Sequence, residues 1–411
     1  MKEYVIVGNG TAAVGVIEGI RSMDKRGKIT VVSEESHPVY CRPLISYYLE
    51  GKTTLRKMNY RPEDFYEKNK CNVLYGTKAE KINSDEKTVY LSNGETLRYD
   101  ELCLSVGSSP FVPAFPGLDT VEKKFGFMTL DDTLALEAAI SPSSRVLIVG
   151  AGLIGLKCAE GLTGRVKSIT VCDLADRVLS SIFDAECAEP MQKELEKHGI
   201  SFILGDTVSN FRQNEAIMKS GVSVPFDILV LAVGVRANIA LASSAGAECG
   251  RGITVDTYMQ TTLPNIYAAG DCAEGYDASA ERNRVLAILP NAYMQGHTAG
   301  VNMTGAHEEF ANAIPMNSIG FFGIHAMSAG SYDGELYAER GEGYIKRLYV
   351  RDGRLCGFML VGDCTERAGI LTNLIREKTP LSSIDFEMLK KISTTAVFSQ
   401  ENRRKKFESV V

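Results

Sequence analysis

Cys41 and Arg42 stand side by side in the stretch HPVYCRPLISYYL, which runs from His37 to Leu49. A cysteine carries redox chemistry as its thiolate, and a neighbouring cation or a helix start lowers the pKa of the thiol. Arg42 or the start of a helix can supply that effect here. From these residues alone, Cys41 is either a redox-active thiol or a structural residue beside a site.

A glycine-rich turn near the N-terminus has the spacing of a phosphate-binding loop. It follows the apolar run Tyr4–Val7, opens a helical stretch over 13–23, and contains Gly8, Gly10 and Ala13. The first glycine permits a tight turn, the second lets the backbone approach a pyrophosphate, and a small third residue lets helix and strand pack closely. The helix N-terminus then supplies amide donors for the phosphates.

An acidic residue completes this first pattern. Glu34 follows a second strand, expected over 29–32, where a carboxylate accepts hydrogen bonds from the hydroxyls of a ribose. The combination of strand, glycine turn, helix, strand and acid predicts a dinucleotide site.

The same pattern recurs in the middle of the chain. Strands are expected over 145–149 and 168–172, with a helix over 156–162 between them and Asp173 at the end of the second strand. A carboxylate there accepts a ribose 2′-hydroxyl and repels a 2′-phosphate, which favours NADH over NADPH, although Arg177 stands nearby. Two such units predict two dinucleotides held close enough to exchange electrons. The glycines of the second turn are Gly150, Gly152 and Gly155.

Composition narrows the class of protein. The 411 residues suffice for two or three domains, and the net charge of −6 argues against nucleic acid as a partner. No targeting peptide or membrane-spanning run is present, so a cytoplasmic protein is expected. The ten cysteines include no Cys-x-x-Cys pair and the five histidines show no ligand spacing, so no metal site is expected. The basic run Arg403–Lys406 is expected to be a solvated end.

Further segments, together with both glycine turns, resemble the pyridine nucleotide-disulfide oxidoreductase superfamily of FAD enzymes. The resemblance extends over residues 1–310, with the motifs in the order of the superfamily. It implies an α/β fold with two Rossmann-like, doubly wound dinucleotide-binding domains and a small C-terminal α/β domain. The matching segments are 102–113 (LCLSVGSSPFVP), 227–242 (DILVLAVGVRANIALA), 265–275 (NIYAAGDCAEG) and 290–303 (PNAYMQGHTAGVNM).

The resemblance also implies domain boundaries. A discontinuous FAD-binding domain is expected over 1–112 and 238–310, with an NAD-binding domain inserted over 113–237. The remaining residues, 311–411, are expected to form a domain for dimerisation or packing, with two-residue alternation over 344–350.

Cofactor contacts follow from the same resemblance. FAD is expected on Gly8, Gly10, Ala13, Glu34, Arg42, Pro43 and Asp271. NADH is expected on Gly150, Gly152, Ile154, Gly155 and Asp173, and Gly234 in the return crossover is a further cofactor contact.

Two positions depart from related enzymes. Disulfide reductases of the superfamily carry a second cysteine five residues after the first, where this chain has Ser46, so that internal disulfide cannot form. The ferredoxin-reductase branch carries a lysine and a glutamate where this chain has Tyr47 and Lys157. Lys157 is therefore expected either to pair with Glu160 in a solvated position or to place a cation near the flavin.

The segments 33–49 and 353–384 resemble NADH:rubredoxin reductases and the flavin modules of nitrite reductases. The expected function is FAD-dependent hydride transfer from NADH to flavin N5, followed by electron delivery to rubredoxin, ferredoxin or an iron–sulfur partner subunit. One alternative is a single-cysteine NADH oxidase or coenzyme A-disulfide reductase that uses Cys41. Another is a flavoprotein that serves as a redox-sensing partner. The electron acceptor, the direction of flow and the oligomeric state, including a homodimer, stay open.

Overall fold

The computed structural model describes residues 1–398, and the chain divides into two compact units. Unit 1 comprises Met1–Ser181, Ala188–Gly275 and Arg284–Phe310, and unit 2 comprises Ile182–Cys187, Tyr276–Asn283 and the residues from Ala311 on. The basic run Arg403–Lys406 lies outside the described residues.

The first parallel sheet of unit 1, here called the N-terminal sheet, has its first strand at the centre. Tyr4 to Val7 are all buried, as expected of a strand covered on both faces. Strand β1 pairs in parallel with β2 and with β7, and the sheet order is β19-β7-β1-β2-β3. The strands are β1 (Glu3–Val7), β2 (Lys28–Val32), β3 (Cys71–Leu74), β7 (Glu101–Leu104) and β19 (Ile266–Ala268).

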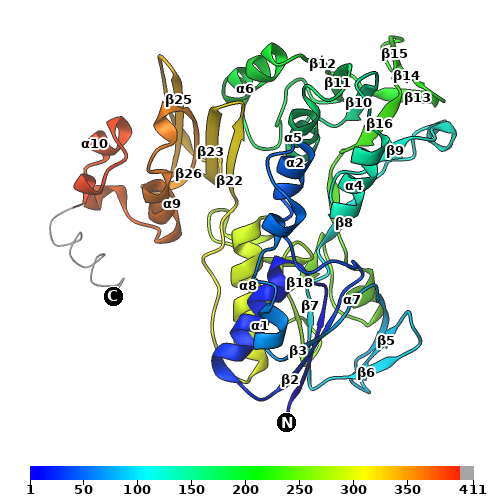
Figure 1. Ribbon diagram of the computed structural model, residues 1–411. Coiled ribbons are helices and arrows are strands. Elements are labelled where there is room, and N and C mark those ends of the chain that lie inside the picture. Colours follow the sequence, from blue (N-terminus) through cyan, green and yellow to red (C-terminus); the bar gives the residue numbers. More distant parts are fainter. Residues whose placement is uncertain (399–411) are drawn as a thin grey trace. The chain divides into compact units, whose positions relative to one another are not determined.

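Helices α1 (Thr11–Met23) and α8 (Leu289–Met303) lie side by side next to this sheet (Figure 1). Glycines on both helices allow their backbones to approach closely. A Cβ atom added to Gly296 would lie 2.1 Å from the Ala12 carbonyl oxygen, and one added to Gly15 would lie 2.3 Å from that of Tyr293. The expected helix over 13–23 is confirmed, and it begins two residues earlier.

The second parallel sheet, here called the central sheet, repeats the arrangement with the order β12-β11-β10-β16-β9. Strand β10 is again central and apolar, and it occupies the five positions expected from the sequence. The strands are β9 (Lys124–Phe125), β10 (Arg145–Val149), β11 (Ser168–Asp173), β12 (Ile200–Leu204) and β16 (Ile228–Leu231). The helices of this region are α4 (Leu130–Ala139), α5 (Leu153–Leu162) and α6 (Ala185–Lys197).

The chain crosses between the two parallel sheets twice. The crossings pair as antiparallel strands, β8 with β17, and Asn238 Nδ2 donates a 2.8 Å hydrogen bond to the Val106 carbonyl. The remaining elements before residue 311 are β4 (Ala79–Asn83), β5 (Thr88–Leu91), β6 (Thr96–Arg98), β8 (Ser108–Pro110), β13 (Val208–Arg212), β14 (Glu215–Met218), β15 (Ser223–Pro225), β17 (Val235–Ala237), β18 (Ile253–Thr254), β20 (Ala273–Asp277), β21 (Arg282–Val285), α2 (Leu44–Leu49), α3 (Phe65–Lys68) and α7 (Ala240–Ser244).

Unit 2 is built on an antiparallel sheet of order β22-β23-β26-β25-β24. Leu371 and Leu374 of α9 lie in the same apolar core as Leu348 and Phe358 of the sheet. The elements are β22 (Met316–Phe321), β23 (Ile324–Gly330), β24 (Glu335–Gly341), β25 (Tyr344–Arg351), β26 (Arg354–Gly362), α9 (Ala368–Arg376) and α10 (Phe386–Lys391). Together the two parallel sheets and this C-terminal antiparallel sheet with its helices confirm the expected α/β fold class.

The expected strand over 344–350 is present, but its residues do not alternate between buried and exposed. Lys346 and Arg347 are 4% and 5% exposed. Lys346 Nζ donates to the Lys390 carbonyl oxygen at 2.5 Å, while the Arg347 guanidinium pairs with Asp184 and Glu186. Polar partners from distant parts of the sequence therefore let both cations be buried on a strand that the pattern predicted to be half exposed.

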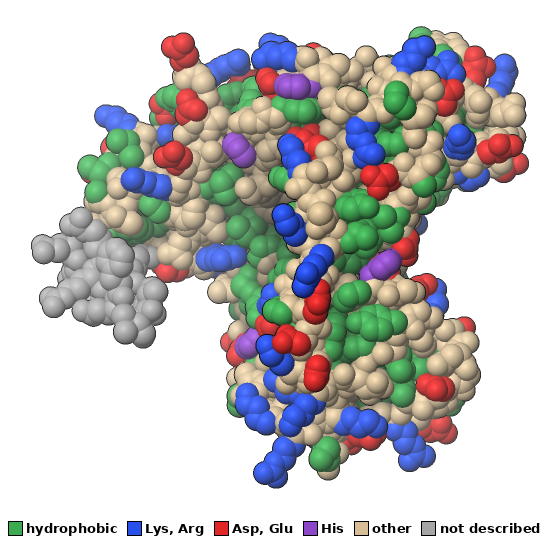
Figure 2. Space-filling model, in the orientation of Figure 1, with side chains coloured by type: hydrophobic (Ala, Val, Ile, Leu, Met, Phe, Trp, Pro, Cys, Tyr) green, Lys and Arg blue, Asp and Glu red, His purple; other side chains and the backbone are tan. Residues whose placement is uncertain are grey.

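Within residues 1–398, no helix combines the length and apolar character needed to cross a bilayer. The same residues contain no group of three or more His, Cys, Asp or Glu side chains arranged to hold a metal ion. On the face of the molecule drawn in Figure 2, Lys and Arg side chains are interspersed with Asp and Glu.

Candidate functional site

The first glycine turn of unit 1 connects β1 to α1. Gly8 has φ +107°, and a Cβ there would lie 2.1 Å from the Ser105 carbonyl oxygen, so only glycine fits. Around Gly10 no described atom lies within 4 Å of an added Cβ, which leaves its backbone open to a ligand. Ala13 is fully buried, as expected of the small third residue.

The second turn, between β10 and α5, has the same geometry. Gly150 has φ +116°, and a Cβ atom added to it would lie 2.2 Å from the Ala232 carbonyl oxygen. The space around Gly152 is open to 4 Å in the described part of the chain, whereas a Cβ at Gly155 would lie 2.0 Å from the Gly150 carbonyl oxygen. Ile154 lies half-buried in the first turn of α5.

Both turns fit the pyrophosphate of a dinucleotide. The first amides of an α-helix have no acceptor within the helix itself. Gly10 and Gly152 are the N-caps of α1 and α5, and as glycines they have no side chain that could cap the helix. Open space and uncapped amides therefore occur together at both turns, and this combination is an anion-binding arrangement.

The two acids expected to contact ribose differ in their surroundings. Asp173 accepts hydrogen bonds from the Ala151 amide at 2.6 Å and from the Ala175 amide at 2.8 Å, which holds it beside the second turn. The Glu34 side chain is 71% exposed and pairs with Lys78 at 3.2 Å. Arg177, which stands near Asp173 in the sequence, lies in the segment between β11 and α6.

Asp271 follows β19 and lies near the first crossover. Its Oδ2 accepts a 3.2 Å hydrogen bond from Ser108 Oγ. Burial raises the pKa of Asp271, although the Ser108 hydroxyl and the Arg42 charge act against that rise. Gly234, at the start of the return crossover, has φ +112°, and its carbonyl accepts from the Phe111 amide at 2.9 Å.

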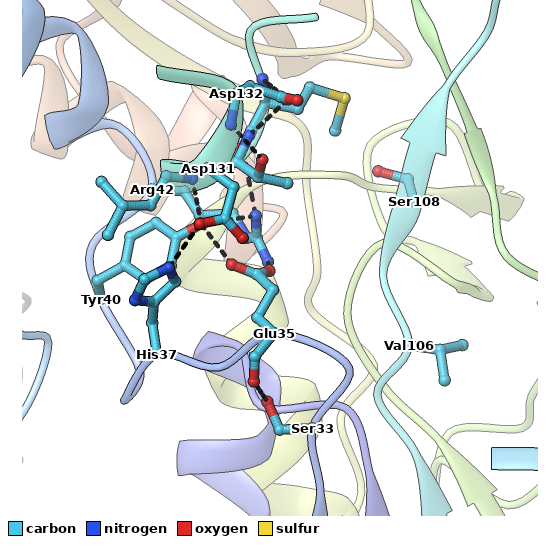
Figure 3. A network of polar contacts seen from close by, with 12 residues as sticks. Ser33, Glu35, His37, Tyr40, Arg42, Val106, Ser108, Asp131 and Asp132 are labelled. Carbon is cyan, nitrogen blue, oxygen red and sulfur yellow. Dashed lines mark hydrogen bonds and ion pairs between the residues drawn. The ribbon is translucent and has the colours of Figure 1, made fainter. Parts of the chain in front are cut away.

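A polar network surrounds Arg42 (Figure 3). The guanidinium donates from Nη1 to Tyr40 Oη at 3.1 Å and to the Met128 carbonyl at 3.2 Å, and from Nη2 to Glu35 Oε1. These bonds use three of the five N–H donors of the arginine. In the part of the chain that the structure describes, these three acceptors leave the Nε–H and one N–H of Nη2 for a ligand. Pro43 directly precedes α2.

The network extends to the start of α4. Tyr40 Oη accepts from the Leu130 amide at 2.9 Å, and His37 Nε2 lies 2.7 Å from Asp131 Oδ1. Thr129 and Asp132 form a capping box on α4. The capping box has a local sequence signature. No sequence signal connected the start of this helix to Tyr40.

Cys41 lies half-buried beside this network. Burial raises the pKa of its thiol. The neighbouring Arg42 guanidinium is directed to Glu35, Tyr40 and Met128, so its charge is already compensated. The surroundings of Cys41 in the described residues therefore favour the neutral thiol over the nucleophilic thiolate. Ser46, which replaces the second cysteine, donates its hydroxyl to the Pro43 carbonyl at 3.1 Å.

Lys157 lies on α5, one turn beyond the second glycine turn. Its Nζ is 2.6 Å from Glu160 Oε2, which confirms the expected pair. The same Nζ lies 5.8 Å from the centroid of the Tyr47 ring on α2. Tyr47 and Lys157, the two residues that differ from the ferredoxin-reductase branch, therefore lie next to each other and form a cation–π contact.

Comparison with known proteins is consistent with this geometry. Residues 2–296 match the family model described as pyridine nucleotide-disulphide oxidoreductase. The NADH-dependent phenylglyoxylate dehydrogenase subunit epsilon of Aromatoleum evansii is 32% identical over 398 residues, which cover 93% of both chains.

Two further similarities concern electron transfer proteins. The assimilatory nitrate reductase electron transfer subunit of Bacillus subtilis is 32% identical over 92% of this chain. The matched region covers 50% of the length of that relative. The crystal structure of the covalent putidaredoxin reductase–putidaredoxin complex contains a chain that is 25% identical, with a TM-score of 0.87 and coverage of 94% of this chain and 95% of that one.

Proposed function

The chain belongs to the pyridine nucleotide-disulphide oxidoreductase family, and we propose that it is the reductase module of an electron-transfer system. Members of the family use FAD and a nicotinamide nucleotide, and the chain is an NAD(P)H-dependent flavin oxidoreductase. We propose NADH as the donor and an iron–sulfur protein or subunit, or a rubredoxin, as the acceptor. A bound flavin supplies the chemistry that accepts a hydride and releases electrons singly.

The single observation that carries this proposal is the pair of open glycine turns in one compact unit. In the proposed arrangement, Gly8 and Gly10 with the amides of α1 bind the FAD pyrophosphate, and Gly150 and Gly152 with α5 bind that of NADH. The other FAD contacts are Ala13, Glu34, Arg42, Pro43 and Asp271. The other nicotinamide nucleotide contacts are Ile154, Gly155 and Asp173, and Gly234 is a further cofactor contact.

The preference for NADH rests on charge around the second turn. Asp173 is held beside the turn by two backbone amides, where its carboxylate accepts a ribose hydroxyl and repels a phosphate. Arg177 is paired with Asp176 at 2.8 Å, which reduces its ability to attract a 2′-phosphate. Measured affinities for NADH and NADPH check this preference.

The domain boundaries belong to the same proposal. FAD would be bound by residues 1–112 and 238–310, the nicotinamide nucleotide by 113–237, and residues from 311 on would serve dimerisation or packing. A cytoplasmic location also stays a prediction, and cell fractionation would check it.

The partner proposal is supported by the relatives. Their names describe a subunit of an NADH-dependent dehydrogenase and an electron transfer subunit of a nitrate reductase, and the solved structure is a complex with putidaredoxin. Proteins that co-purify with the chain under native conditions should include one that carries an iron–sulfur centre or a rubredoxin-type site.

Rapid mixing tests the core of the proposal. The FAD-loaded protein mixed with NADH should lose its flavin absorbance within the time of turnover, and with NADPH it should do so more slowly. If neither nucleotide bleaches the flavin, the proposed function is wrong.

The competing activity is a thiol-dependent NADH oxidase or coenzyme A-disulfide reductase that uses Cys41. Cys41→Ser distinguishes the two, because it removes the thiol and keeps a small polar side chain. We expect unchanged carrier reduction and unchanged NADH oxidation. Loss of NADH oxidation in this variant would favour the thiol mechanism.

A further inference from the structure

Two covalent crossovers, which pair as β8 and β17, join the N-terminal sheet to the central sheet within unit 1. Noncovalent contacts join them as well, and one group of these lies between the segment after β2 and the start of α4 (Figure 3). There Tyr40 and Arg42 bind the Leu130 amide and the Met128 carbonyl, and Glu35 binds both of these side chains. We call this group of contacts the clasp.

Tyr40 is the centre of the clasp. It is 7% exposed, and its hydroxyl donates to Glu35 Oε2 at 2.8 Å while it accepts from the Leu130 amide at 2.9 Å and from Arg42 Nη1 at 3.1 Å. A phenol has one donor and two acceptor positions, so the whole capacity of this hydroxyl is used. A buried group with every hydrogen bond satisfied holds a defined geometry.

Arg42 adds the second hydrogen bond across the same boundary. Its Nη1 reaches the Met128 carbonyl at 3.2 Å, two residues before the Leu130 amide that donates to Tyr40. Glu35 balances the arginine charge within the clasp. The segment that precedes α4 is therefore bound at two backbone groups by the side chains of Tyr40 and Arg42. Two such bonds fix both the distance and the orientation between this segment and the one that follows β2.

Helix α2, which follows Arg42 in the sequence, extends this contact to α5 of the central-sheet region. The Arg165 guanidinium, just beyond α5, donates to the Leu49 carbonyl at the end of α2. A Cβ on Gly161 of α5 would lie 3.0 Å from the Ser46 carbonyl oxygen on α2. The segment from Glu35 to Leu49 thus lies against both α4 and α5, and α5 carries the second glycine turn at its N-terminus.

We propose that Tyr40 is a positioning residue that sets the distance between the two nucleotide-binding turns and hence the alignment of nicotinamide and flavin. This inference rests on the proposed function. Transfer between two bound groups requires the reacting atoms to lie roughly 3–3.5 Å apart, and a 1 Å misplacement costs about 10²-fold in rate. Tyr40 does not act on the nucleotides directly in this proposal. It acts through the segment at the start of α4, whose Leu130 amide it binds.

Tyr40→Phe tests the proposal because it keeps the buried ring and removes only the hydroxyl. Tyr4→Phe is the matched control: Tyr4 is also buried, in β1, and its hydroxyl makes a 3.0 Å hydrogen bond to Asp24. In Tyr40→Phe we expect flavin bleaching at saturating NADH to slow roughly 10-fold. The long-wavelength absorbance of stacked nicotinamide and flavin should weaken as well, with FAD content and the Kd for NAD⁺ changed less than about 3-fold. The control should match the wild type.

Hydrogen exchange gives a readout that does not depend on turnover. The Leu130 amide should exchange faster in Tyr40→Phe than in the wild type, while amides at the centre of β1 and β10 should be unchanged. Bleaching and nicotinamide–flavin absorbance at wild-type values in Tyr40→Phe would overturn the positioning role alone. An equal loss in Tyr4→Phe would also overturn it, because a general loss of stability would then explain both. Wild-type protein that NADH fails to bleach would instead overturn the proposed function.

Discussion

The Nζ atom of Lys157 lies 5.8 Å from the centroid of the Tyr47 ring, so a cation of α5 contacts an aromatic ring of α2. The same ammonium pairs with Glu160, and the two side chains are only 20% and 11% exposed. The sequence predicted the Lys157–Glu160 pair correctly. Of the two alternatives left open for Lys157, a solvated position does not fit the structure, because the Tyr47 ring of α2, which is distant in the sequence, lies beside its ammonium group.

Lys157→Met should lower the free energy of unfolding by about 1–3 kcal/mol, since it withdraws a charged partner from a carboxylate that is mostly buried. Urea denaturation measures this change. Lys193→Met is the control, because the Lys193–Glu189 pair is equally short but largely exposed, and its loss should cost less than about 0.5 kcal/mol. Equal losses in the two variants would contradict the assignment.

A matching change on the partner sharpens the result. Adding Glu160→Gln to Lys157→Met should recover part of the lost stability, because the buried carboxylate is then neutral. Additive losses would mean that the two side chains do not interact in solution.

The parts of the fold that the sequence predicted are those encoded by local patterns. The strand Arg145–Val149 was placed without error, and both helices after the glycine turns were predicted a few residues late. Short apolar runs, glycine spacing and helical periodicity are properties of neighbouring residues, so they can be recognised in a single sequence. The open space around Gly10 and Gly152 agrees with the expected approach of a ligand.

The clasp could not be predicted in the same way. The Thr129–Asp132 capping box is a local signal, but the hydrogen bond from the Leu130 amide to Tyr40 joins residues 90 positions apart. Arg42 was expected only as a cofactor contact, and its bonds to Glu35 and Met128 depend on how two sheets pack. Burial of Lys346 has the same origin, since its main acceptor is the Lys390 carbonyl.

The close packing of α1 on α8 predicts a large effect at Gly296. In Gly296→Ala the new methyl group would lie 2.1 Å from the Ala12 carbonyl oxygen, so the helices must separate. We expect a loss of about 2–3 kcal/mol in the free energy of unfolding and reduced FAD content, because α1 carries the first glycine turn. Gly369→Ala in α9 is the control, since no described atom lies within 4 Å of its added Cβ. A variant as stable as the wild type would refute the close approach.

For Gly10 and Gly152, which have open space around an added Cβ, we expect a loss of ligand binding with little loss of stability. Gly10→Ala and Gly152→Ala add a methyl group to open space, so the free energy of unfolding of the cofactor-free protein should change by less than about 1 kcal/mol. Binding should fall selectively: FAD affinity in Gly10→Ala and NADH affinity in Gly152→Ala, each by roughly 10-fold or more, because the methyl group occupies the path of the phosphates. Calorimetric titration of each variant with both nucleotides separates the two effects. Loss of both affinities in one variant would indicate a folding defect instead.

The Arg145–Asp227 ion pair predicts how stability changes with pH. The Arg145 guanidinium donates to both Asp227 carboxylate oxygens at 3.0 and 2.8 Å, and these hydrogen bonds lower the pKa of Asp227 from its ordinary value of 3.8 to about 2. A carboxyl group whose pKa is lower in the folded state binds its proton more readily when unfolded. Its stabilising contribution is therefore complete above pH 4 and disappears as the pH falls through about 2.

Asp227→Asn should accordingly cost about 1 kcal/mol at pH 7, a modest amount because both side chains are 37% exposed. The difference from the wild type, taken from urea midpoints at pH 7, 5, 4 and 3, should stay constant down to about pH 4 and then shrink. Glu63→Gln, which removes the exposed pair with Arg56, should differ from the wild type by less than about 0.5 kcal/mol at every pH. A difference for Asp227→Asn that stays constant or grows as the pH falls from 4 to 3 would show that the Arg145 contact does not lower the pKa of this carboxyl group.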